Sequence, residues 1–232
     1  MTDSDERMSL KDGVLTGALR RPINRAATVK GSIHDDETAT KLGLRGGTVA
    51  GSVHMDLFGP LLLEAFGETW WEKGTLSLYF VNATTDREPV RAFMVLPPAG
   101  AKDVQVDVWI EREDGLRVAE GTASVGSPSE PTALMRKPLD RFDSGDLRIL
   151  KDLSPGDPIA PTEGMVTQGT VDQHLRFTTD PLDMYRESRW GKPVVPITSY
   201  IGLFFTQGAA PVRRKLHDVV GLFGAIEIRN IN

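Results

Sequence analysis

The stretch from residue 33 to residue 67 constrains the fold of this chain more than any other part. It joins a short polar segment, a glycine-rich turn over residues 43–47 and a mostly apolar segment. Acids at the start of the polar segment predict a helix that begins at His34 or Asp35, because a helix N-terminus favours negative charge. Apolar residues then recur at i, i+3 and i+4, which predicts a helix from about Ala50 to Phe66 with one wide buried face. Pro60 should kink it, because proline removes a backbone hydrogen bond.

The hydrophobic period changes to two after Gly74, which is typical of strands with one buried face. Four strands are predicted, at residues 75–80, 90–94, 104–110 and 118–123, with a hairpin turn at Asp114-Gly115. We expect them to form a meander. Residues 14–19 are a candidate first strand, and residues 1–12 look like a solvated tail. An α+β fold follows, in which a curved antiparallel sheet wraps the apolar helix.

Composition narrows the function classes. The 232 residues carry a formal net charge of -5, which argues against nonspecific binding to nucleic acid or to acidic membranes. There are no cysteines, so disulfides, thiolate metal sites and a cysteine nucleophile are excluded. The acidic N-terminus does not look like a secretory signal, and no apolar run reaches the ~18 residues of a membrane span. We therefore expect a cytoplasmic protein. No phosphate loop or metal-binding spacing is present, so no cofactor or metal is expected.

The order of residues from position 33 to position 51 resembles a family motif. MaoC-like hydratases and dehydratases, which have the hotdog fold, carry D-x-N-P-x-H-x-D, then G-[FL]-x-G-x-[IV]-A-H-G and a long apolar helix. This chain reads I-H-D-D, then L-G-L-R-G-G-T-V-A-G. The resemblance covers about the first third of the chain. It departs from the motif at two positions. Val29 stands where the motif has its first acid, and Ala50 stands where the motif has its second histidine.

The resemblance implies that His34 is the catalytic histidine, which works with an acid to add water to an enoyl thioester or to run the reverse elimination. Because Val29 replaces the motif's acid, Asp36 is the candidate partner, provided that the loop folds back. Gly51 matches the glycine whose N–H faces the thioester carbonyl, and Gly47 belongs to the same substrate-binding turn. The alternative is that His34 only orients the helix start and that the glycines only permit a tight turn.

His54 and Asp56 lie in the first turns of the apolar helix. Hotdog thioesterases place a carboxylate on this helix, so the pair offers a hydrolytic alternative. Two residues apart on a helix, however, they face different sides. We keep His54 as a candidate substrate-binding residue.

The second half of the chain echoes the first at a constant offset, so that Val195 to Phe204 aligns with Val49 to Phe58. The same offset sets Asp180 opposite His34 and Tyr185 opposite Ala39. This predicts a double hotdog with a first copy at 1–125, a linker at 126–146 and a second copy at 147–232. Asp180 and Tyr185 would line the pseudo-symmetric position without reacting.

The second copy is short, because only residues 225–229 read as a strand after its apolar helix. Either the sequence is truncated or another chain supplies the missing strands. The resemblance implies a hydratase or dehydratase, a lyase, for an acyl or enoyl thioester of coenzyme A or a carrier protein. The alternatives are a non-catalytic acyl-thioester-binding or scaffold protein and a thioesterase. The expected protein partner is a second copy of the chain or a partner hotdog subunit.

Overall fold

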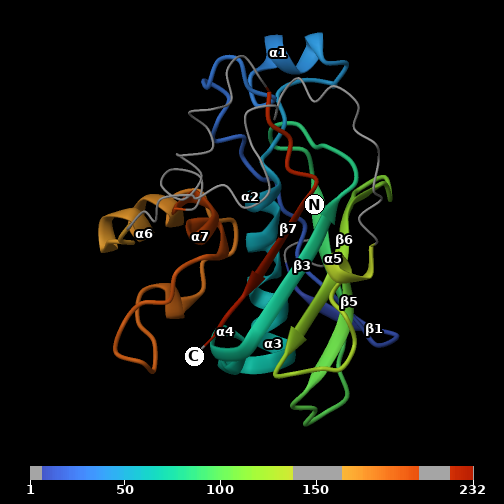
Figure 1. Ribbon diagram of the computed structural model, residues 1–232, viewed down its shortest axis with the longest axis vertical. Helices are drawn as coiled ribbons and strands as arrows, with labels where there is room; N and C mark the ends of the chain where they lie inside the picture. Colours follow the sequence, from blue (N-terminus) through green and yellow to red (C-terminus); the bar gives the residue numbers. More distant parts are fainter. Residues whose placement is uncertain (1–6, 138–163, 204–219, 232) are drawn as a thin grey trace, which may run out of the picture.

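A seven-stranded antiparallel sheet curves around a central run of helices (Figure 1). The computed structural model describes residues 7–137, 164–203 and 220–231. The strands are β1 (Ser9–Lys11), β2 (Val14–Thr16), β3 (Gly74–Phe80), β4 (Val90–Val95), β5 (Val104–Arg112), β6 (Arg117–Val125) and β7 (Ala225–Arg229). The helices are α1 (Asp36–Lys41), α2 (Gly51–Met55), α3 (Gly59–Phe66), α4 (Trp70–Lys73), α5 (Ala133–Arg136), α6 (Gln168–Leu175) and α7 (Ile197–Leu203). No helix of these residues is long and apolar enough to cross a membrane.

The predicted apolar helix exists, but its backbone is divided. A 3₁₀ turn at Asp56–Phe58 separates α2 from α3, with Pro60 in the first turn of α3. Proline fits there because the first N–H groups of a helix have no partner inside the helix. The break therefore lies where the sequence predicted a kink, and both parts still follow one path along one face of the sheet (Figure 1).

The core lies between this helical run and the concave face of the sheet. Leu61 and Leu62 of α3 are 1% and 0% exposed, and they belong to the same cluster as Leu76 and Leu78 of β3. Trp70 of α4 belongs to the same cluster, and its ring packs against Gly74 at the start of β3. Burial of this face explains why the i, i+3, i+4 pattern is strong in the sequence.

The four predicted strands are confirmed, but the meander is wrong. The sheet order is β4-β5-β6-β3, so β3 pairs with β6 and not with β4. The connection from β3 to β4 is too long for a tight hairpin and runs instead beside the start of α2, where the Val49 N–H donates to the Thr84 carbonyl at 2.9 Å. The turn at Asp114-Gly115 does join β5 to β6 as predicted.

The N-terminal region contains one strand more than the sequence predicted. Residues 9–11, assigned to a solvated tail, form β1 and pair with β2 through a turn at Asp12-Gly13, where both residues have positive φ. The predicted first strand at 14–19 is shorter, ending at Thr16, although Gly17 still donates to the Ala92 carbonyl at 2.7 Å.

Elements of the second half pack directly on the first half. Helix α7 lies against α2, and β7 pairs with β3 at the end of the sheet (Figure 1). Helix α7 begins at Ile197 and α2 at Gly51, which are the positions aligned by the repeat. From the predicted linker, residues 131–137 lie on the outer face of β3 and β6, where the Ala133 N–H donates to Thr122 Oγ1. Residues 138–163, which include the predicted start of the second copy, lie outside the described residues.

Candidate functional site

A hydrogen bond from the imidazole ring of His34 holds this residue near the segment that leads into α2. Its Nδ1 lies 2.7 Å from the carbonyl oxygen of Thr48, three residues before Gly51. A carbonyl only accepts hydrogen bonds, so Nδ1 carries the proton and the lone pair of the neutral ring sits on Nε2. The side chain is half-buried. Nε2 has no hydrogen-bond partner among the described residues, so His34 presents a basic nitrogen on a ring that is tied to the segment before α2.

Two further residues fix the loop that carries His34. Asn24 donates from Nδ2 to the His34 carbonyl at 2.8 Å, and its own N–H donates to Asp86 Oδ1 at 2.7 Å. A Cβ on Gly47 would lie 2.3 Å from the His34 carbonyl oxygen, so only glycine permits this approach. Sequence reasoning missed Asn24, because it lies in an irregular segment with no periodic or motif signal.

The structure does not bring Asp36 to the ring of His34. Its Oδ1 accepts from the Gly47 N–H at 2.7 Å and so braces the glycine turn. Asp35 caps α1 by accepting from the N–H groups of Glu37 and Thr38. The hydrogen bond from the Thr38 hydroxyl, reinforced by the N–H groups of Thr38 and Gly31, lowers the pKa of Asp35 to about 2 against the opposing effect of burial. Val29, at the motif's acid position, is 53% exposed. Within the described ranges, no carboxylate pairs with His34.

Gly51 is the first residue of α2, as predicted. Its N-cap residue, Ala50, makes no side-chain hydrogen bond to the helix. The Val53 N–H donates to the Ala50 carbonyl at 2.9 Å, whereas the Gly51 N–H has no hydrogen-bond partner among the described residues. A Cβ at position 51 would lie 2.7 Å from the ring of Phe80, so the aromatic ring requires glycine here as well. The Thr48 carbonyl that holds the His34 ring lies three residues before Gly51, and Asp36 braces the preceding glycine turn through the Gly47 N–H.

The seam between the two halves is a buried hydrogen-bonded cluster. The Thr198 N–H donates to Asp56 Oδ1 at 2.9 Å, and Thr198 Oγ1 contacts both Asp56 Oδ2 and, at 3.0 Å, the Ser52 carbonyl oxygen. The hydroxyl proton of Thr198 is either shared between these two acceptors or, when Asp56 is protonated and donates to Thr198, directed to the Ser52 carbonyl oxygen. Burial raises the pKa of Asp56 to about 6 against the lowering effects of Thr198 and Arg25, so Asp56 holds its proton below about pH 6.

We expect the free energy of unfolding to fall as the pH rises from about 4 to about 6. In this range the folded protein keeps the proton on Asp56 and the unfolded chain loses it, so folding takes up a proton and weakens as protons become scarce. The expected loss is about 2–3 kcal/mol. Urea unfolding of the wild type and of Asp56→Asn at several pH values isolates this group. Parallel pH profiles for the two proteins would contradict it.

His54 points to the opposite side of the helix from Asp56. It is 2% exposed, and its Nε2 lies 2.8 Å from Thr84 Oγ1. Burial lowers the pKa of His54 to about 4, although Glu88 acts in the opposite direction, so the ring is neutral near pH 7. The ring lies in the interior and not on an accessible surface, and its contact with a substrate stays a prediction.

Asp180 and Tyr185 are the two candidate residues from the second half. The carboxylate of Asp180 accepts hydrogen bonds from both Nε and Nη2 of Arg20, and the shortest of these is 2.6 Å. Tyr185 is fully buried against Gly59, its hydroxyl has no hydrogen-bond partner among the described residues, and burial raises its pKa. Both side chains are therefore engaged in joining the halves, and their role in lining a substrate channel is untested.

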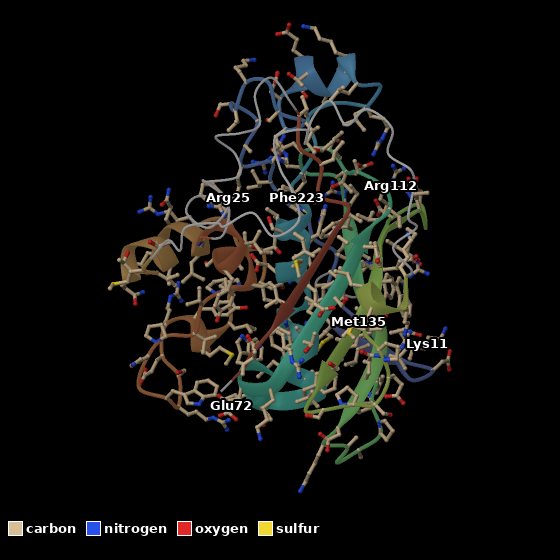
Figure 2. All side chains as sticks on the ribbon, in the orientation of Figure 1. Lys11, Arg25, Glu72, Arg112, Met135 and Phe223 are labelled. Carbon is tan, nitrogen blue, oxygen red and sulfur yellow. The ribbon has the colours of Figure 1, made fainter. Side chains whose placement is uncertain are left out.

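A histidine–serine pair near the seam was not predicted. His174 Nδ1 lies 2.6 Å from Ser199 Oγ, and Arg25, whose guanidinium stacks over the ring of Phe177, lies on the same side of the molecule (Figure 2). Burial, with a smaller effect of Arg25, lowers the pKa of His174. Ser199 is only 1% exposed, so this pair fastens α6 to α7 and does not face a ligand.

Comparison with solved structures defines the fold class. A putative MaoC domain protein dehydratase from Chloroflexus aurantiacus J-10-fl matches with a TM-score of 0.53 and 14% identity, over 88% of this chain and 72% of that one. A MaoC-like dehydratase matches with a TM-score of 0.46 and 14% identity, over 89% and 79% of the two chains. The R-hydratase PhaJ1 from Pseudomonas aeruginosa matches with a TM-score of 0.38 and 17% identity, over 52% of this chain and 84% of that one. No protein-family model and no curated protein matches the chain.

The chain therefore has an α+β hotdog fold, as the sequence predicted. Its fold is that of MaoC-like dehydratases, which is the resemblance that residues 33–51 suggested. Structural similarity at such low sequence identity establishes the fold alone. The chemistry must be argued from His34 and its surroundings.

Proposed function

We propose that this protein is a MaoC-like hydratase or dehydratase, a lyase that acts on an enoyl or 3-hydroxyacyl thioester of coenzyme A or of a carrier protein. The observation that carries this proposal is the hydrogen bond from His34 Nδ1 to the Thr48 carbonyl. In the neutral tautomer it leaves the lone pair on Nε2, and it ties the ring to the segment that leads into α2. A base and an oxyanion donor within one neighbourhood are what the addition of water to an enoyl thioester needs.

Hydration would proceed with His34 as the only proton carrier. Nε2 takes a proton from water as the water oxygen bonds to C3 of the enoyl group. The electrons of the C2–C3 double bond move toward the thioester carbonyl, and the Gly51 N–H stabilises the resulting enolate oxygen. The imidazolium of His34 then returns its proton to C2. Dehydration is the same sequence in reverse.

A binding or scaffold protein is the second candidate. It is favoured because no acid of the 29–36 segment pairs with His34. Val29 is exposed, while Asp35 and Asp36 are engaged in capping and in bracing the turn. Without a carboxylate to assist His34, the site would retain a thioester without turning it over. The thioesterase alternative depends on Asp56, but this carboxyl group is 8% exposed and bonded to Thr198. That geometry disfavours it as a nucleophile or base.

One set of assays separates the three functions. Crotonyl-CoA is incubated with the protein, and the enoyl absorbance and the release of free thiol are followed together. We expect the enoyl absorbance to fall without thiol release, because hydration keeps the thioester intact. Thiol release would establish hydrolysis instead. Calorimetric binding of crotonyl-CoA with neither signal would establish the binding protein and overturn the proposed reaction.

A further inference from the structure

The aromatic ring of Phe80 lies against the start of α2. A Cβ built on Gly51 would lie 2.7 Å from two carbons of this ring, Cε2 and Cζ. The Cα–Cβ bonds of a helix tilt toward its N-terminus, so this Cβ direction points past the same end of α2 toward which the Gly51 N–H is directed. The ring therefore occupies space beside the position of any oxygen that accepts a hydrogen bond from the Gly51 N–H.

Strand β3 holds Phe80 in place from both of its edges. Phe80 lies opposite Ala119 of β6, and its N–H donates to the Gly224 carbonyl at 2.8 Å. Side chains alternate along a strand, so Phe80 shares the concave face with Leu78 and packs, partly buried, against the same core cluster. Because the backbone is paired on both edges, the residue cannot move away from α2 as a unit.

The chemistry of a thioester decides which part of it meets this ring. Its sulfur leads to the long pantetheine arm, which coenzyme A and carrier proteins share and which must run out to solvent. The acyl carbons therefore lie on the inner side of the carbonyl group, where Phe80 packs against the core. C2 is the acyl carbon next to the carbonyl group, so it is the first to meet the ring.

We infer that Phe80 is a specificity-determining residue, whose ring excludes a methyl branch at C2 and selects thioesters that are unbranched there. Carbon atoms in contact lie about 3.5–4.0 Å apart, and the ring already crowds the Cβ position of Gly51, so it leaves no room for a methyl carbon beside the carbonyl group. The inference rests on the proposed function, because it requires the thioester carbonyl to accept from the Gly51 N–H. It adds the class of acyl group that the site takes.

Two saturated thioesters measure this selection without turnover. Butanoyl-CoA is unbranched, and its isomer 2-methylpropanoyl-CoA carries a methyl branch at C2. Calorimetry should show that the wild type binds butanoyl-CoA at least about tenfold more tightly, the lower end of what one such carbon contributes in an apolar pocket. In Phe80→Ala the two dissociation constants should differ by less than about threefold, because the wall is gone. Phe80→Leu, which keeps apolar contacts with the core, should give an intermediate ratio, and its ratio decides the test if Phe80→Ala does not fold.

Phe66→Ala is the matched control, since Phe66 is also partly buried against the core but lies at the last position of α3, at the opposite end of the helical run from Gly51. Its binding ratio should equal that of the wild type. A wild type that binds the two isomers equally, or binds neither, overturns the inference. So does a ratio that both Phe80 variants leave unchanged, or one that Phe66→Ala abolishes as well.

Turnover of crotonyl-CoA separates this inference from the proposed reaction. Hydration by a wild type that binds both isomers equally would refute only the role of Phe80. Selection against the branched isomer that Phe80→Ala removes, in a protein without turnover, would refute only the reaction.

Discussion

Replacement of His34 by glutamine is expected to lower kcat for enoyl thioester hydration about 10²–10⁴-fold, the range that general acid–base groups contribute. Glutamine is close to histidine in size, but it cannot take a proton from water. The dissociation constant for crotonyl-CoA should change less than about threefold, because the N–H groups of α2 are untouched. Steady-state kinetics and calorimetry of the two proteins measure these changes.

Asp36→Asn is the control for this experiment. The asparagine Oδ1 can still accept from the Gly47 N–H, so the turn is kept while the charge is removed. Activity within about threefold of the wild type would show that Asp36 braces the turn. A loss as large as that of His34→Gln would mean that the acid works with the histidine, which contradicts the single-carrier mechanism.

Leu62→Ala is expected to reduce the free energy of unfolding by about 2–5 kcal/mol, because it leaves a cavity in a fully buried cluster. Leu63→Ala is the matched control on the same helix, since Leu63 is only partly buried and should lose less. Urea unfolding of the three proteins at one pH measures both changes. Losses below about 1 kcal/mol for Leu62→Ala would show that α3 is not the centre of the fold.

The hydrophobic pattern predicted the elements because each one buries a single face. The helix over 50–66 and the strands with period two were found for this reason, and Pro60 revealed the break between α2 and α3. The neighbours of β3 could not be predicted in the same way. Pairing with β6 and β7 depends on the path of residues 81–89 past α2, and local periodicity does not describe such a path.

The order of His34, Gly47 and Gly51 in the sequence predicted a candidate site, and the role of these residues stays a prediction. The sequence could not show that His34 binds the Thr48 carbonyl or that Asn24 holds the His34 backbone, because these contacts depend on how two loops fold together. Asp56 illustrates the same limit. Its place on the helix was evident, but its raised pKa follows from burial at a seam where Thr198, from the other half of the chain, contacts it.

The pairing of β3 with β7 has a consequence for synthesis on the ribosome. Strand β3 gains its neighbour β6 soon after it is made, but Arg229, which pairs with Thr75, is added about 150 residues later. At bacterial or eukaryotic elongation rates this interval lasts roughly 10–30 s. During that time the nascent chain carries β3 with one side unpaired, next to the apolar surface that Ile226 and Ile228 will cover. Chaperone demand during translation is therefore expected to be concentrated on the β3 segment, and to fall once β7 has left the ribosome and paired with β3.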